Sequence, residues 1–259
     1  MKISVLAENT AKNDCYGAEH GLSMYLEIGE EKILFDTGAS SLFIENAKKL
    51  GIDLSQVDKV IISHGHNDHG GGLQSFFSIN QKAKVFVTAR AFGRYFNDSN
   101  KDISIDASLL STGRFVVYDE KLELVDNVEV LTCNNAKPRT AINCYGLKMV
   151  ENSCLVDDDF KHEQYMVVEE NGKRIVFSGC SHKGIINICE WLQPDVLIGG
   201  FHFMRIDDDK ILQEAADQLN TFNADFYTCH CTGLKQYECL KQKMPRLHYL
   251  SSGDVLEIK

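Results

Sequence analysis

The sequence predicts an α/β protein built as a four-layer αββα sandwich, in which two sheets pack face to face with helices outside. Each half of the chain begins with strand patterns and then alternates strand and helix patterns, which is the order this architecture requires. Histidine-rich motifs also follow predicted strands in both halves, as expected for a site built at strand ends. We therefore expect a single domain over residues 1–259, built of two similar halves at about 1–132 and 164–259.

In the first half, short apolar runs rich in β-branched residues predict the strands. They are expected at residues 2–6, 23–28, 32–35, 58–62, 84–88, 115–118, 121–125 and 128–132. Helices are expected at 40–50, where Gly51 ends the apolar periodicity, and near 71–78. Residues 133–163 carry no clear periodicity and are interpreted as a long irregular connection.

The second half opens with a hairpin, because Asn171-Gly172 between two strand patterns favours a tight two-residue turn. The two strands are expected at 164–169 and 173–178. Further strands at 195–199, 225–228 and 247–258 alternate with helices at 183–192, 207–222 and 232–243.

Composition excludes several classes of function. Hydrophobic residues make up 44% and charged residues 25%, as in ordinary globular proteins. The net charge of −10 argues against nucleic acid as a partner, and no apolar run approaches the length of a membrane span. A cytoplasmic location is expected. The nine cysteines include no CxxC pair, which favours reduced thiols over a disulfide framework.

Residues 63–72 (Ser-His-Gly-His-Asn-Asp-His-Gly-Gly-Gly) follow a predicted strand and form the strongest functional motif. His64 and His66 point to the same side of an extended segment, so both can reach one ion. Asp68 and His69 come after the chain has begun to turn and can reach a second ion. We therefore interpret this segment, here called the metal loop, as a source of ligands for two metal ions.

Three further histidines follow predicted strands in the second half, at His182, His202 and His230. Because successive strand ends lie close together, these side chains are expected to converge. Cys229 and Cys231 flank His230. If the strand continued through them, the two thiols would face away from His230, so we interpret them as small buried hydrophobic residues.

The pattern His-x-His-x-Asp-His over residues 64–69 resembles the metallo-β-lactamase superfamily, and Asp36 resembles the early aspartate of that superfamily. Within it, the chain is similar to the group of 7,8-dihydropterin-6-methyl-4-(ribofuranosyl)aminobenzene-5′-phosphate synthases, also described as metal-dependent hydrolases. The matching segments are residues 19–23, 33–38, 63–72, 179–182, 199–202 and 230–233. The resemblance implies the metallo-β-lactamase fold and a bound metal.

The resemblance also implies a ligand set. His64 and His66 would bind the first metal, and Asp68, His69 and His230 the second. His182 is expected as a further ligand, because Cys180 stands where many superfamily members have a bridging aspartate. His162 or Glu163 is the alternative for this third ligand of the first metal.

The expected cofactor is zinc, as one or two ions, with manganese or iron as alternatives. Zinc lowers the pKa of a bound water to about 7, giving a hydroxide that attacks a small ester-, amide- or phosphate-type substrate. Asp68 and His202 are the expected catalytic residues, with His202 stabilising the developing oxyanion. His20, Glu19 and Arg139 are candidates for binding the substrate.

Three alternatives to this hydrolase remain open. The name of the similar group implies a transferase that joins a pterin to a ribosylaminobenzene phosphate. A protein that binds metal or a small ligand without catalysis is the second alternative, although a closed structural zinc site requires four ligands and no open position. Di-iron redox chemistry is the third.

Overall fold

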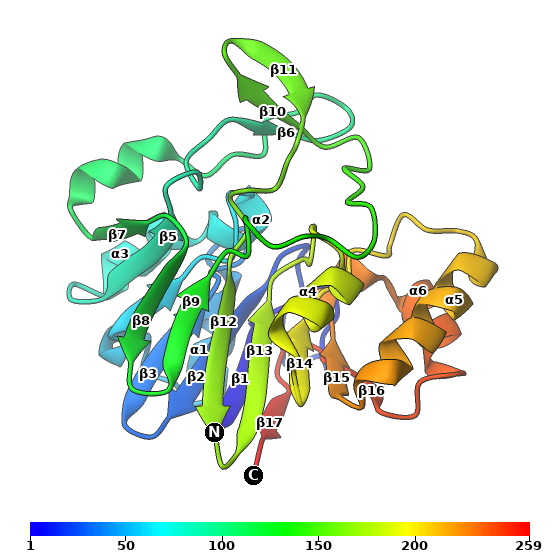
Figure 1. The fold of residues 1–259 in the computed structure, drawn as a ribbon. Helices are drawn as coiled ribbons and strands as arrows, with labels where there is room; N and C mark the ends of the chain where they lie inside the picture. The colour runs from blue at the N-terminus through cyan, green and yellow to red at the C-terminus, as the bar shows by residue number, and fades with distance from the viewer. The chain divides into compact units, whose positions relative to one another are not determined.

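The computed structural model describes all 259 residues, which divide into two compact units. Unit 1 comprises Met1–Asp119, Gly146–Gln164 and Ser251–Lys259, and unit 2 comprises Glu120–Tyr145 and Tyr165–Leu250. Each unit contains a seven-stranded mixed sheet with helices packed against it (Figure 1). None of the helices combines the length and the apolar character needed to cross a membrane.

The sheet of unit 1 has the strand order β17-β1-β2-β3-β4-β5-β7. Its strands are β1 (Lys2–Ala7), β2 (Ser23–Ile28), β3 (Glu31–Phe35), β4 (Lys59–Ile61), β5 (Lys84–Thr88), β7 (Phe115–Tyr118) and β17 (Val255–Glu257). The four strands from β3 to β7 run parallel, whereas β17, β1, β2 and β3 pair antiparallel. The segments that follow β3, β4 and β5 therefore leave the same edge of the sheet.

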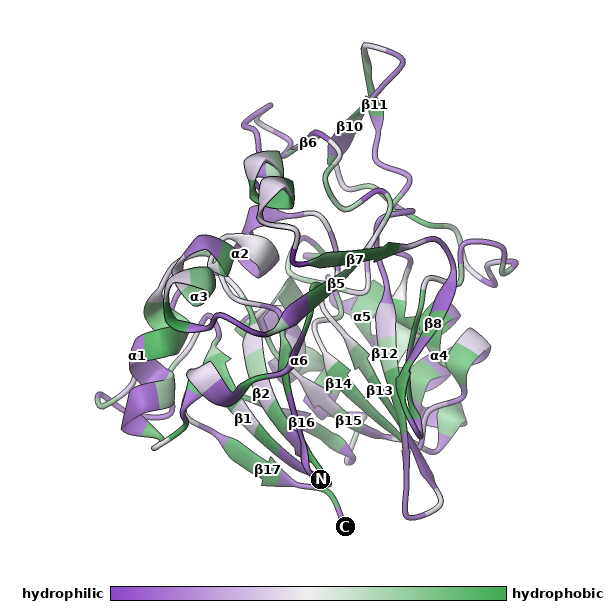
Figure 2. Cartoon of the chain, turned by 90° about the vertical axis from the view of Figure 1, so that its left-hand side faces the viewer, coloured by the Kyte–Doolittle hydropathy of each residue, from purple (hydrophilic) through white to green (hydrophobic).

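The helices of unit 1 are α1 (Leu42–Lys49), the one-turn α2 (Asn67–Gly70) and α3 (Leu73–Ile79), with 3₁₀ turns at Leu54–Gln56 and Ala107–Thr112. Helix α1 contains both hydrophobic and hydrophilic residues, as expected for a helix with one side against a sheet (Figure 2). Phe43 of α1 and Phe76 of α3 pack with Leu6, Val60 and Val85 of the sheet in one buried cluster. This cluster holds the strand ends in place.

A small third sheet corrects one sequence prediction. Residues 133–163 were expected to be irregular, but they contain β10 (Lys148–Glu151) and β11 (Cys154–Asp157), and β10 also pairs with β6 (Tyr95–Phe96). The hairpin turns at Asn152 and Ser153, whose φ angles of 48° and 65° suit a two-residue turn. Most residues of β11 are exposed, so the strand lacks the alternation of buried and exposed residues that periodicity detects.

The sheet of unit 2 has the order β16-β15-β14-β13-β12-β9-β8. Its strands are β8 (Lys121–Val125), β9 (Val128–Leu131), β12 (Tyr165–Glu170), β13 (Lys173–Ser178), β14 (Val196–Gly199), β15 (Asp225–Thr228) and β16 (Leu247–Tyr249). The predicted hairpin turn is confirmed, since Asn171 and Gly172 have φ angles of 53° and 73°. The strands from β13 to β16 run parallel, so the segments after β13, β14 and β15 share one edge.

The helices of unit 2 are α4 (Ile185–Leu192), α5 (Asp209–Leu219) and α6 (Leu234–Lys241), with 3₁₀ turns at Asn220–Phe222 and His230–Thr232. Ile188 of α4, Leu212 of α5 and Leu240 of α6 pack in one cluster with Leu197 and Phe226 of the sheet (Figure 1). The chain between β15 and α6 is thereby fixed at both ends.

Gln164 ties together the ends of β4 and β5 next to the metal loop. Its side chain is fully buried, and its amide nitrogen donates to the carbonyl oxygens of Ile62 (2.6 Å) and Phe86 (3.0 Å). Its amide oxygen accepts from the hydroxyl of Tyr118, and its backbone N–H donates to the carbonyl of Ser63 at 2.8 Å. Gln164 therefore holds the start of the metal loop through its backbone and the two strands through its side chain.

Replacing this side chain by an apolar group of similar size tests that attachment. Gln164→Leu removes the side-chain hydrogen bonds to the Ile62 and Phe86 carbonyl oxygens and to the Tyr118 hydroxyl, so we expect the free energy of unfolding to fall by about 2–4 kcal/mol. Urea unfolding measures this loss. Gln81→Leu is the matched control, because Gln81 is exposed, and an equal loss in both variants would contradict the role of Gln164.

Candidate metal centre

The metal loop combines an extended segment and one turn of helix. The backbone is still extended at His66 (φ −95°, ψ 145°), and α2 begins at the next residue. As a result, the ring of His64 lies 4.6 Å from that of His66 and 4.1 Å from that of His69, measured between centroids. All three rings are buried. The predicted turn between His66 and Asp68 is confirmed, and it gathers three imidazoles into one cluster.

Asp36, which follows β3, holds this cluster in place through hydrogen bonds. Its Oδ2 lies 2.7 Å from Nδ1 of His69 and 2.7 Å from the hydroxyl of Ser63, and its Oδ1 accepts from the Ser63 N–H at 2.7 Å. A carboxylate accepts hydrogen bonds, so Nδ1 of His69 carries the proton and Nε2 carries the lone pair. A carboxylate that accepts from one ring nitrogen of a histidine in this way orients the other nitrogen toward a metal.

Asp158 and His162 also hold the metal loop, and of these two residues the sequence analysis named only His162, as an alternative ligand. Nδ1 of His162 accepts a hydrogen bond of 2.9 Å from the Gly65 N–H, and its Nε2 lies 3.1 Å from Oδ2 of Asp158. Both ring nitrogens of His162 are therefore engaged in hydrogen bonds, and its role as the alternative metal ligand stays a prediction. Glu163 is fully buried. Only the proximity of an aspartate and a histidine at i and i+4 in residues 158–162 hinted at this pair.

Asp158 also approaches His66, whose Nε2 lies 3.5 Å from Oδ2 of the carboxylate. Burial opposes ionisation of Asp158, but His162 and His66 outweigh it and hold the pKa of this carboxyl well below its usual range. Burial lowers the pKa of His66, despite the opposing effect of Asp158. His66 is thus neutral at physiological pH, which is the form that binds metals.

Asp68 lies on the more open side of the cluster, with its side chain 19% exposed. Its Oδ2 is 3.7 Å from Nε2 of His69 and 3.5 Å from Nε2 of the exposed His20. His20 therefore borders the metal loop. Glu19 accepts hydrogen bonds from the backbone N–H groups of Ala39 and Ser40, so its carboxylate organises the segment before α1.

Unit 2 contains a second cluster of possible metal ligands. The ligand atoms of Cys180, His182 and His202 all lie within 4.8 Å of one another, and so do those of Cys180, His230 and Cys231. The expected convergence of the three histidine motifs is confirmed within this unit, because each follows one of the parallel strands β13, β14 and β15. Of these five residues, only His202 is half-exposed; the others are buried.

The expectation that Cys231 faces away from His230 is wrong. Strand β15 ends at Thr228, and residues His230–Thr232 form a 3₁₀ turn, so side chains no longer alternate between two faces. The Sγ atom of Cys231 instead donates to the carbonyl oxygen of Cys180 at 3.4 Å. Burial opposes ionisation of Cys231, but hydrogen bonds with Cys180 and His202 hold the pKa of its thiol well below the usual value.

Arg139 belongs to unit 2 and is exposed. Its backbone N–H donates to Oδ1 of Asn187 at 2.8 Å, and its guanidinium pairs with Glu190 at 3.0 Å. Both partners belong to α4. These contacts fix the backbone of Arg139, while its role in binding substrate stays a prediction.

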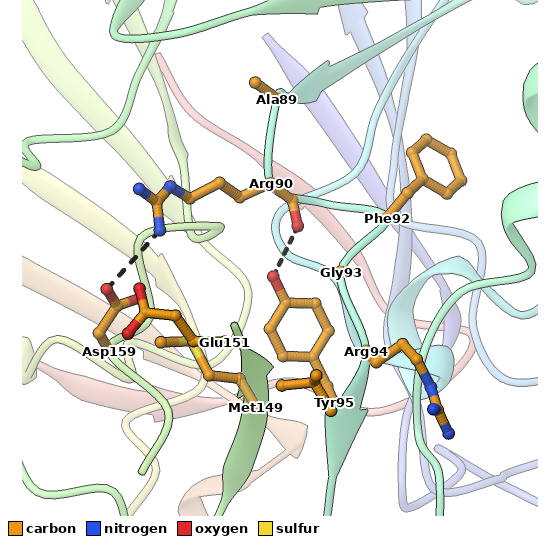
Figure 3. A pocket seen from close by; sticks show the side chains of 10 residues that line it. Ala89, Arg90, Phe92, Gly93, Arg94, Tyr95, Met149, Glu151 and Asp159 are labelled. Carbon is orange, nitrogen blue, oxygen red and sulfur yellow. Dashed lines mark hydrogen bonds and ion pairs between the residues drawn. The ribbon is translucent and has the colours of Figure 1, made fainter. Parts of the chain in front are cut away.

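Unit 1 contains a cavity of about 270 Å³ around Tyr95 and Arg90 (Figure 3). The residues that line it are Ala89, Arg90, Phe92, Gly93, Arg94, Tyr95, Met149, Val150, Glu151 and Asp159. Tyr95 connects the cavity to the cluster, since its ring lies 4.1 Å from that of His162 and 5.6 Å from that of His66. Its hydroxyl donates to the Arg90 carbonyl at 2.6 Å. The sequence analysis left these residues unassigned.

Several known proteins are similar to this chain in sequence. The family model of the metallo-β-lactamase superfamily matches residues 16–92, which include Asp36 and the metal loop. The chain is 29% identical over 280 residues to the 7,8-dihydropterin-6-methyl-4-(β-D-ribofuranosyl)-aminobenzene-5′-phosphate synthase of Methanocaldococcus jannaschii, covering 96% of this chain and 94% of that protein. It is 28% identical to an uncharacterized protein of the same organism, covering 93% and 94%.

Two solved structures are also similar. Tm1679, described as a metal-dependent hydrolase of the β-lactamase superfamily, is 27% identical, with a TM-score of 0.82 and coverage of 100% of this chain and 99% of that chain. The Zn²⁺-bound PqqB of Methylobacterium extorquens shares the fold at 11% identity, with a TM-score of 0.60 and full coverage of both chains. The predicted fold class is thereby confirmed as the fold of the metallo-β-lactamase superfamily.

Proposed function

We propose that this protein is a metal-dependent hydrolase that uses a metal-activated water on a small ester-, amide- or phosphate-type substrate. The observation that carries the proposal is the buried imidazole cluster of His64, His66 and His69, in which Asp36 orients His69. The likeness to Tm1679, itself described as a metal-dependent hydrolase, supports the same activity.

The residues of unit 1 fit a zinc ion. Neutral imidazoles and a carboxylate are ligands that zinc prefers, and carboxylate-bound histidines are typical of its sites. Nδ1 of His64 lies 2.9 Å from the Ser63 hydroxyl and Nδ1 of His69 lies 2.7 Å from Asp36. Their Nε2 atoms would therefore be the ligands. Manganese and iron accept the same donors, so they remain alternative metals in the proposal.

The roles of individual residues follow from the family resemblance. His64 and His66 would bind one ion, Asp68, His69 and His230 would bind a second, and His182 would be a further ligand. A bound zinc ion supplies a hydroxide at neutral pH. Asp68 would hold the attacking water in register, and His202 would donate a hydrogen bond to the developing oxyanion. His20, Glu19 and Arg139 are proposed to contact the substrate.

A transferase is the second candidate, favoured by the 29% identity to the dihydropterin synthase over nearly the whole of both chains. The hydrolase and the transferase differ in the nucleophile that attacks the substrate. A hydrolase consumes water and works on one substrate, whereas the synthase-type reaction requires an aminobenzene acceptor and releases diphosphate. Assays of the zinc-loaded protein with phosphodiesters, thioesters and lactones, and with a pterin-methyl diphosphate plus acceptor, separate them. Metal binding without turnover in any assay would favour the non-catalytic alternative.

One prediction concerns Asp36, whose carboxylate accepts hydrogen bonds from Ser63 and His69 of the metal loop. Asp36→Asn keeps the size of the side chain but removes the charge that fixes the His69 tautomer, so we expect zinc affinity to fall roughly 10- to 100-fold. Competition with a chromophoric chelator measures this affinity. Asp106→Asn is the control, because Asp106 is exposed and caps a 3₁₀ turn through Ser108. Unchanged zinc affinity in Asp36→Asn would refute the anchoring role.

Another prediction concerns Asp68. Asp68→Ala removes a proposed ligand together with the group that positions the water, so metal content and turnover should fall together, turnover by roughly 100-fold or more. Elemental analysis and the hydrolase assay measure the two quantities. The exposed Asp102→Ala provides the control. A variant of Asp68 with full metal content and full turnover would contradict the assignment.

A further inference from the structure

We propose that Tyr145 is a positioning residue that holds the imidazole of His202 in one orientation. His202 is the group that the proposed function assigns to the developing oxyanion, so this role of Tyr145 rests on the proposed function and deepens it. Tyr145 is half-buried and ends residues 133–145, here called the connecting segment, which belongs to unit 2 together with His202. Long irregular segments of this kind commonly carry functional side chains.

Packing determines how the His202 ring is turned. Both of its ring nitrogens are buried, and neither has a hydrogen-bond partner among the nitrogen and oxygen atoms of the protein. Apart from the Cys231 sulfur, the imidazole packs against two rings, those of His182 and Tyr145, with centroids 4.3 Å and 5.5 Å away. The torsion that turns a histidine ring has a broad energy minimum, so neighbouring rings decide its value.

The backbone is strained at both members of the Tyr145–His202 pair. Their φ angles are 48° and 55°, in the left-handed region that residues other than glycine seldom adopt. Such conformations persist where the surroundings fix them, and they are concentrated at functional sites. The side chain of Asn143 accepts a hydrogen bond of 2.9 Å from the Tyr145 N–H and stabilises the bend. The two strained residues meet through their rings.

Helix α4 fixes the connecting segment. Asn187 of this helix is fully buried, and its Oδ1 accepts hydrogen bonds of 2.8 Å from the backbone N–H groups of both Arg139 and Thr140. Its Nδ2 donates to the Thr140 carbonyl at 3.0 Å. One turn further along, the Trp191 indole donates to the Lys137 carbonyl at 2.9 Å. The segment is therefore ordered before a substrate binds, which lets it present Tyr145 at a defined place.

Crystal structures of the zinc-loaded protein test this role without relying on turnover. Tyr145→Ala removes the ring, so we expect the His202 imidazole to turn or to occupy more than one orientation. Tyr145→Phe keeps the ring and should leave the imidazole as it is in the wild type. Tyr227→Ala is the matched control, because Tyr227 also packs on a histidine, His248, with ring centroids 5.0 Å apart.

A double-mutant cycle tests whether Tyr145 acts through His202. With bis(p-nitrophenyl) phosphate as the substrate, Tyr145→Ala should lower kcat about 10- to 100-fold and change KM less than about twofold, because a misplaced His202 weakens transition-state stabilisation. Tyr145→Phe should restore kcat to near the wild-type value. In the His202→Ala protein, the same Tyr145→Ala substitution should have no further effect on kcat.

The outcomes separate failure of this role from failure of the proposed function. A single, unchanged His202 orientation in Tyr145→Ala would overturn the role, whether or not the protein turns over any substrate. An equal loss of kcat with and without His202 would also overturn it. If His202→Ala keeps full turnover, the catalytic assignment of His202 fails, while the crystal structures still decide whether Tyr145 holds the ring.

Tryptophan fluorescence controls for the fold of the variants. Trp191 is the only tryptophan in the chain, so an unchanged emission spectrum shows that the connecting segment stays attached to α4. If Tyr145→Ala alters this emission, Tyr145→Leu repeats both measurements, because leucine keeps more of the apolar side chain and still removes the ring.

Discussion

The buried carboxylate of Asp36 is the interaction on which the metal loop depends. A charge removed from water is costly unless hydrogen bonds compensate, and Asp36 receives them from Ser63 and His69. The sheet brings these partners together, because β3 and β4 pair in parallel with Phe35 opposite Ile61. The loop after β4 therefore starts beside the residue after β3. The parallel pairing of β3 and β4 thus also places Asp36 where it can orient the proposed ligand His69.

The loop is restrained from a second direction as well. His162 accepts the Gly65 N–H, Asp158 holds His162, and Gln164 binds the strand ends through their carbonyl groups. These contacts join the metal loop to a segment about a hundred residues later in the chain. Their combined effect is to fix the imidazoles before any metal arrives, which lowers the entropic cost of binding and favours one coordination geometry.

The sequence was sufficient where local pattern determines structure. Strands such as Lys84–Thr88 and Asp225–Thr228 were predicted with the bounds that the structure shows, because buried runs of β-branched and aromatic residues have few alternatives. The exposed hairpin of β10 and β11 lacked such a pattern. The contact of His162 with Gly65 was equally invisible, since it depends on tertiary packing. Cys231 was misplaced because the alternation of a strand was extended into a 3₁₀ turn.

The residues that determine the fold also differ from the residues that select a substrate. The fold accounts for the sheets and for the position of the metal loop, but a fold supports many reactions, and substrate choice depends on the groups around the site. The small sheet of β6, β10 and β11, which the periodicity did not predict, lies next to histidines of the metal loop. Tyr95 of β6 packs on His162 and His66, and the adjoining cavity offers Arg90 and Glu151 as charged contacts (Figure 3). Because the Arg90 guanidinium already faces Asp159 at 3.8 Å, a substrate phosphate would have to compete with that carboxylate.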